Sequence, residues 1–84
     1  MLKEGAVVLS LSGRDKGKLL AVVGNEQNRV LVCDGKERPV ERPKRKNMCH
    51  LEEQGTVLGA EEIATNKALK RALRRLNPSL NGKT

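Results

Sequence analysis

Three short apolar runs follow one another within the first 33 residues, and they constrain the fold more than any other feature of the chain. In residues 7–12, the apolar positions 7, 9 and 11 alternate with Val8, Ser10 and Ser12, which is typical of a half-buried strand. The runs at 18–23 and 29–33 are short and rich in β-branched residues. Polar turns rather than helix-length segments separate the runs, so we expect the strands to pair antiparallel. The sequence therefore predicts a mainly β domain, a meander rolled into a small barrel that leaves few open edges.

The middle and the last third of the chain have different patterns. Residues 38–47 contain two prolines and many charges, so they belong at a sheet edge or in an extended loop, whereas 48–51 is apolar enough for a last short strand. Residues 65–77 place apolar and basic side chains on opposite faces of an amphipathic basic α-helix, with Thr65 as its N-cap and a leucine face that docks on the barrel. The expected organisation is a barrel over 1–52, an irregular linker over 53–64, the docked helix over 65–77 and a flexible tail over 78–84.

The composition limits what the interior can contain. The chain has 84 residues, two cysteines and no Phe, Tyr or Trp. One small core of aliphatic side chains is expected, too thin for a large buried active-site cavity. Two cysteines are too few for the disulfide framework of small secreted domains. The sequence shows neither a signal-peptide core nor an apolar run of membrane-spanning length, so we expect a cytoplasmic protein with no membrane partner.

The positive charge is concentrated in two stretches. The formal net charge is +7, yet residues 1–35 are almost neutral. Residues 36–49 hold six basic residues against two acidic ones, and residues 67–75 hold five more basic residues. Such local excess points toward a polyanionic partner.

A glycine-containing basic loop joins the first two predicted strands. Gly13 and Gly17 permit backbone conformations closed to other residues and allow a phosphate to approach the main chain. Arg14, Lys16 and Lys18 supply three positive charges within residues 14–18. A solvated β-turn remains the alternative interpretation of this loop.

The residues around this loop resemble a known family. Residues 5–24, with Asp15-Lys16-Gly17-Lys18 at their centre, resemble the KOW motif of ribosomal proteins and transcription elongation factors, whose key glycine corresponds to Gly17. Residues 29–35 and 42–51 are similar to small bacterial KOW-domain RNA-binding proteins related to large-subunit ribosomal proteins of eukaryotes and archaea. The resemblance implies an SH3-like five-stranded barrel that binds RNA, above all ribosomal RNA. Cys49 departs from the lysine expected in the closing segment, and the C-terminal helix matches only loosely.

Two further basic segments are candidates for RNA contact. Residues 42–46 hold four cations around Pro43, more than the nearby Glu37 and Glu41 can pair, although a solubilising loop is the alternative. The basic face of the helix either contacts RNA or is simply solvated. The candidate RNA-binding residues are Arg14, Lys16, Gly17, Lys18, Arg42, Lys44, Arg45, Lys46, His50, Lys67, Arg71 and Arg74.

Other chemistries have less support in the sequence. Cys33, Cys49 and His50 are poor zinc ligands as a set, because adjacent residues of a strand point to opposite faces and no paired Cys-x-x-Cys occurs. We expect two core thiols, a surface or RNA-facing histidine, and neither metal nor cofactor. One histidine without a paired nucleophile or a carboxylate dyad gives no basis for catalysis, so we expect neither an enzyme nor a small-molecule substrate.

The absence of aromatic rings also limits how RNA could be bound. Single-strand binders stack bases on Phe, Tyr or Trp, so structured RNA held through phosphates and shape fits better. The sequence thus predicts a ribosomal or ribosome-associated RNA-binding protein, with ribosomal proteins as possible further partners. An SH3-like protein-interaction module acting in transcription or translation is the alternative, and nonspecific DNA binding is a weaker one.

Overall fold

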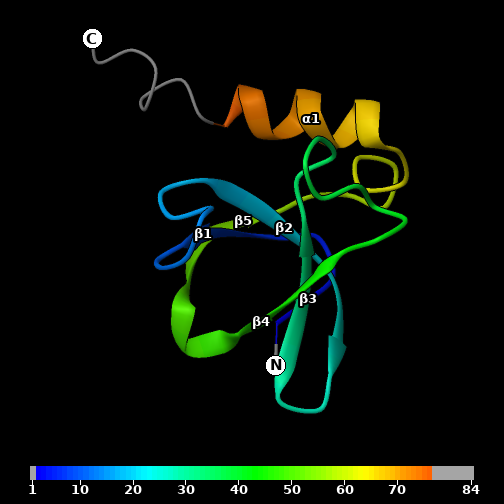
Figure 1. Cartoon of the computed structure of the whole chain (residues 1–84). Helices are drawn as coiled ribbons and strands as arrows, with labels where there is room; N and C mark the ends of the chain where they lie inside the picture. The colour runs from blue at the N-terminus through cyan, green and yellow to red at the C-terminus, as the bar shows by residue number, and fades with distance from the viewer. Residues whose placement is uncertain (1, 77–84) are drawn as a thin grey trace, which may run out of the picture.

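The computed structural model describes residues 2–76 as one five-stranded antiparallel sheet with an α-helix packed across it (Figure 1). The strands lie in the order β4-β3-β2-β1-β5, and each neighbouring pair is antiparallel. The expected mainly β class and antiparallel pairing are confirmed. In chain order the elements are β1 (Ala6–Ser10), β2 (Leu19–Glu26), β3 (Arg29–Cys33), β4 (Lys44–Asn47), the 3₁₀ turn η1 (Met48–His50), β5 (Leu51–Val57) and α1 (Asn66–Arg75).

The last strand differs from its prediction. Residues 48–50 form η1 instead of a strand, and β5 then continues to Val57, into the first part of the stretch expected to be a linker. Among the described strands, β5 pairs with β1 alone, and most of its side chains are exposed. An edge strand with solvated side chains carries no apolar alternation, which is why the pattern missed it. The basic strand β4 forms the other edge, in line with the expectation for residues 38–47.

The sheet buries both of its faces. Across the ladders, paired residues point to the same side, so the register Val7↔Ala21↔Cys33 defines one face. The register Val8↔Leu20 belongs to the opposite face. Partly buried Leu2 and Leu51 pack against that second face, and its buried cluster is Ala6, Val8, Leu20, Val22, Val30 and Val32. Burial on both faces explains why residues 19–23 form an unbroken apolar run.

The helix α1 covers the first of these faces. Leu69, Ala72 and Leu73 are buried against Val7, Ala21, Cys33 and Leu58. The Oγ1 atom of Thr65 accepts a hydrogen bond from the backbone N–H of Ala68 at 3.1 Å, so the predicted N-cap is confirmed. The leucine face of the helix packs on the sheet. Burying one such leucine stabilises the fold by about 1.5–3 kcal/mol.

The last residue of the predicted helix, 77, and the whole predicted tail, 78–84, lie outside the described part of the chain. Within residues 2–76, the structure contains no helix that is both long enough and apolar enough to cross a membrane.

Candidate nucleic-acid interface

The β1–β2 loop, residues 11–18, is held tightly in place by its own backbone. The Gly17 N–H donates to the carbonyl of Ser10 at 2.8 Å, and the Ser10 N–H donates to the carbonyl of Lys18 at 3.0 Å. Gly17 has a φ of +87°, in the left-handed region that favours glycine, while a Cβ added there would meet open space. Glycine is therefore favoured at residue 17 by the left-handed backbone conformation and not by the close approach of another atom.

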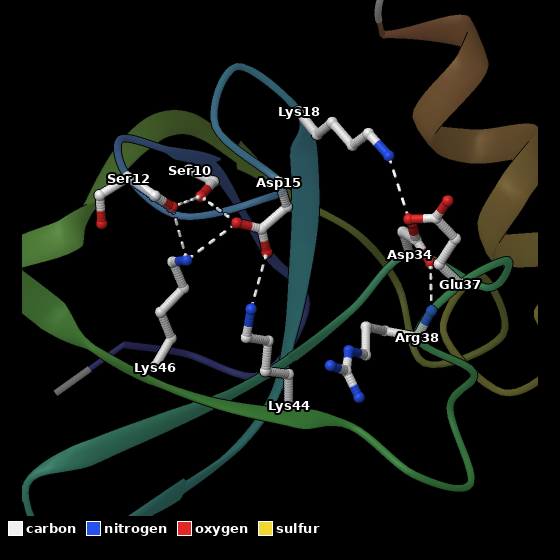
Figure 2. Close-up of polar contacts among 9 residues, drawn as sticks. All are labelled: Ser10, Ser12, Asp15, Lys18, Asp34, Glu37, Arg38, Lys44 and Lys46. Atoms are coloured by element: carbon white, nitrogen blue, oxygen red, sulfur yellow. Dashed lines mark hydrogen bonds and ion pairs between the residues drawn. The ribbon is translucent and has the colours of Figure 1, made fainter.

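A cluster of charged and polar groups gathers around Asp15 in this loop (Figure 2). The Lys46 Nζ atom lies 2.9 Å from Asp15 Oδ1 and also donates to the carbonyl of Ser12 at 2.9 Å. The Ser10 hydroxyl donates to the same carboxylate at 2.7 Å, and Lys44 Nζ lies 3.7 Å from Oδ2. Only 6% of the Lys46 side chain is exposed. The Asp15 cluster, defined here as Ser10, Ser12, Asp15, Lys44 and Lys46, thus ties β4 to the β1–β2 loop.

The charge state of Asp15 follows from this environment. Burial of the carboxyl raises its pKa, but hydrogen bonds from Lys46 and Ser10, together with the charges of Lys46 and Lys44, lower it by more. The net result is a pKa below the ordinary value of 3.8. Asp15 is therefore ionised at neutral pH and compensates the charge of the buried lysine.

The basic run 42–46 is divided by the alternation of β4. Lys44 and Lys46 pair in register with Val32 and Val30, so they point to the interior side of the curled sheet. Arg45 points the other way, and its Nε donates to Glu26 Oε1 at 2.6 Å. The hydrogen bond and charge of Glu26 raise the pKa of this guanidinium. The expectation that these cations lack partners is wrong for Lys44, Arg45 and Lys46, because the acids that pair them come from β2 and the β1–β2 loop.

The β3–β4 loop, residues 34–43, begins with a turn built on Asp34. Its Oδ1 atom accepts hydrogen bonds from the backbone N–H groups of Lys36 at 2.8 Å and Arg38 at 2.9 Å. This turn fixes the direction in which the loop leaves β3. Lys18 reaches across from the start of β2 and pairs with Glu37 of this loop at 3.1 Å (Figure 2).

The same loop is fastened to the first turn of α1. The Asn66 side chain accepts a hydrogen bond from the Val40 N–H at 2.7 Å and donates to Glu41 Oε1 at 3.0 Å. Gly35 has a φ of +79°, and a Cβ added there would lie 2.6 Å from the Asn66 carbonyl oxygen. The close approach of loop and helix therefore requires glycine at this position.

A cleft opens where α1, the β3–β4 loop and the start of β2 meet, with a volume of about 360 Å³. We call it the helix cleft. Its floor includes Leu19 and Leu73, and its rim carries cations from three separate segments of the chain. The lining residues are Gly17, Lys18, Leu19, Asp34, Lys36, Lys70, Leu73 and Arg74.

A second hollow, of about 510 Å³, shares Lys18 and Asp34 with the helix cleft and extends toward the Asp15 cluster. Its lining includes further cations of both loops and of β4. These residues are Arg14, Arg38 and Lys44, beside Asp15, Leu20 and Glu37. The two hollows together form a basic surface that runs along the β1–β2 and β3–β4 loops to α1.

The candidate residues divide between this surface and other places. Gly17, Lys18 and Arg74 line the helix cleft, and Arg14, Lys18 and Lys44 line the second hollow. Arg45 lines a separate hollow beside the β2–β3 turn. The remaining candidates line neither of the two joined hollows, and these are Lys16, Arg42, Lys46, His50, Lys67 and Arg71.

Three cations of this surface were missed as site residues. Lys36 and Arg38 lie within three residues after the predicted Asp34-Gly35 turn. Basic residues so close to a turn were the available sequence signal for a loop that contacts RNA. Lys70 stands one helical turn before Arg74, so the two share a face of α1. The sequence shows that both helix residues are basic, but not which part of the helical face looks onto the loop.

The two thiols and the histidine lie in different surroundings. Cys33 is buried under α1, and burial, followed by the charges of Asp34 and Glu41, raises its pKa to about 11. Its thiol is therefore protonated at neutral pH. Cys49 is exposed on η1, so the expectation of a second core thiol is wrong. His50 is also exposed, at the end of η1 that joins β5.

No protein-family model matches the sequence, and the search of curated proteins gives no significant match. The geometry of the basic surface and the residues that form it are therefore the basis for assigning a function.

Proposed function

We propose that the protein binds structured RNA, ribosomal RNA above all, as a ribosomal or ribosome-associated protein of the cytoplasm. The observation that carries this proposal is the convergence of cations from three segments on one surface, from the β1–β2 loop, the β3–β4 loop and α1. Within residues 2–76, several of these cations form no ion pair with the protein. They are Arg14, Lys36, Arg38, Lys70 and Arg74.

The surface is organised before any ligand binds. Asp15 holds the β1–β2 loop to β4, and Asn66 holds the β3–β4 loop to α1. Cations on fixed segments lose little conformational freedom on binding, so more of each phosphate contact appears as affinity. The arrangement favours a ligand with several phosphates at defined spacing, as in a folded RNA.

We also infer that the curled sheet is an SH3-like barrel of the KOW type. The support is a contact between Lys46 on β4 and the loop that follows β1. Because β3 and β2 lie between β4 and β1 in the sheet order, this contact requires the sheet to curl. The positive φ of Gly17 at the expected key position, and the sequence resemblance over residues 5–51, support the same assignment.

The composition favours binding through phosphates and shape. The chain has no aromatic residue on which a base could stack, so single-strand binding through stacked bases is disfavoured. Folded RNA offers phosphates and 2′-hydroxyls in fixed positions. In this proposal the protein is a binding protein and not an enzyme.

The test is a comparison of two triple variants in RNA binding. Lys36→Gln, Lys70→Gln and Arg74→Gln remove charge from the helix cleft, whereas Arg42→Gln, Lys67→Gln and Arg71→Gln remove the same charge elsewhere. With ribosomes and a folded rRNA fragment at fixed low salt, we expect the first triple to lose about 100-fold in affinity and the second less than about tenfold.

The outcomes separate the proposal from its competitors. Equal losses in both triples would mean that only net charge matters, and the cleft would have no special role. If the unaltered protein binds neither ribosomes nor folded RNA at low salt, the RNA proposal fails and a protein-interaction module is the better account. Equal competition by duplex DNA would show nonspecific binding to nucleic acid.

A further inference from the structure

The helix cleft combines an apolar floor with a cationic rim. Leu19 and Leu73 contribute aliphatic surface at the base, and Lys36, Lys70 and Arg74 stand around it. Phosphates alone do not need an apolar floor, since a charged backbone gains nothing from leucine side chains. The volume of about 360 Å³ falls within the range of small-ligand sites, roughly 300–1,000 Å³. The cleft therefore fits a group with both a flat apolar part and negative charge close by.

The wall of the cleft also carries a free hydrogen-bond acceptor. Asp34 lines the cleft, and its Oδ1 atom is occupied by the backbone N–H groups of Lys36 and Arg38. Its Oδ2 atom accepts no hydrogen bond from the residues that the structure describes. A carboxylate oxygen is a suitable partner for the exocyclic amino group of a nucleobase.

The cleft is preformed, with one open side. Asn66 and the close packing of Gly35 fix the loop against α1. Gly17 also lines the cleft, and a Cβ added there would meet no protein atom within 4 Å, so this part of the lining is open.

We propose that the helix cleft receives one unpaired nucleotide that projects from an RNA helix. The base lies against Leu19 and Leu73 with an amino group toward Asp34, and the neighbouring phosphates contact Lys36, Lys70 and Arg74. This inference rests on the proposed function, and it adds that the RNA carries a bulged nucleotide at the contact. A bulged base is the natural ligand because extruding a paired base breaks its pairing and stacking, a cost that an unpaired base avoids.

Three RNA hairpins that differ only at one position of the stem test the inference. The first has a single unpaired adenosine in its stem, the second has a fully paired stem, and the third has an abasic ribose in place of the adenosine base. At one salt concentration we expect the full-length protein to bind the adenosine bulge about tenfold more tightly than the paired stem, because burying a base against apolar side chains is worth roughly 1.4 kcal/mol. The abasic hairpin keeps the extra phosphate and bend but loses the base, so it should bind like the paired stem.

The protein variants locate the contact. Asp34→Asn keeps an oxygen for the backbone N–H groups of Lys36 and Arg38 but replaces the free acceptor with an amide NH₂. It should therefore remove most of the preference for the bulge, whereas Lys67→Gln, on α1 outside the cleft, should keep it. Retention of the preference by Asp34→Asn overturns the inference, as does equal affinity for the three hairpins. Equal but measurable affinity leaves the proposed RNA binding intact, whereas absence of binding to every hairpin, ribosome and rRNA fragment contradicts the proposed function itself.

Discussion

The lysines of the Asp15 cluster and the cations of the helix cleft belong to the same basic protein but have opposite surroundings. Lys46 is almost fully buried and meets a carboxylate and a carbonyl, whereas Lys36 and Lys70 are exposed and form no ion pair within the described residues. The first group stabilises the loop, and the second is available to a ligand. The number of charges in a segment therefore does not indicate their role, because strand alternation and distant acidic residues decide which cations are paired.

Replacing the buried lysine should have the largest effect. Lys46→Met keeps most of the side-chain volume but leaves Asp15 ionised and partly buried, so we expect the free energy of unfolding to fall by about 3 kcal/mol. Urea unfolding followed by circular dichroism measures this. Lys44→Met is the matched control, since its longer and more exposed pair should contribute only about 0.5 kcal/mol. A loss of stability no larger for Lys46→Met than for the control would remove the distinction between the two groups.

The next effect tests the support of the helix cleft. Gly35→Ala places a Cβ 2.6 Å from the Asn66 carbonyl oxygen in a left-handed backbone conformation, so we expect a loss of about 2 kcal/mol in unfolding free energy and weaker RNA binding. Gly17→Ala is the control, because it has the same sign of φ but open space around the added carbon, and should cost about 1 kcal/mol. Equal losses in both variants would show that backbone conformation alone matters at residue 35.

Acid should weaken the Asp15 cluster. The folded-state pKa of Asp15 lies below 3.8, so its contribution is complete above that pH and disappears as the pH falls through the folded-state value. We expect the wild-type protein to exceed Asp15→Asn in urea midpoint at neutral pH, and the difference to vanish in strong acid. Urea midpoints measured from about pH 6 down to about pH 2 follow this directly. A difference that stays constant with pH would mean that the Asp15 carboxylate charge does not stabilise the loop.

The smallest effect is expected on the outer face of β4. Arg45 pairs with Glu26 at the surface, where both side chains are largely exposed. Exposed ion pairs contribute little, so Arg45→Gln should leave the urea midpoint unchanged within error. It should also leave the affinity for folded RNA within about twofold, because Arg45 lies outside the two joined hollows. A large loss of RNA affinity would extend the interface to the outer face of β4.

Much of the fold followed from local patterns. The first three strands were predicted with bounds close to those observed, from the alternation at residues 7–12 and the turn residues between the apolar runs. The helix was predicted in the same way from its N-cap at Thr65 and its amphipathic pattern. The strand β5 was missed beyond its first residue, Leu51, because an edge strand with exposed Glu52 and Glu53 has no apolar period.

The candidate site could be predicted less well than the fold. The glycine and cations of the β1–β2 loop were found because they are adjacent in sequence. The internal pairing of Lys46 with Asp15 was not, since it joins residues 31 positions apart across a curled sheet. Lys70 was also missed, because only the packing of α1 on the β3–β4 loop shows which helical cations face a cleft.

The most direct test of the division between structural and ligand-facing cations is the salt dependence of RNA affinity. The slope of the logarithm of the association constant against the logarithm of salt concentration counts phosphate contacts. At a temperature where all proteins are folded, we predict that Lys70→Met lowers the steepness of this slope by about one relative to the wild type, while Lys46→Met leaves it unchanged. The reverse pattern, a lower slope for Lys46→Met and an unchanged slope for Lys70→Met, would contradict the account.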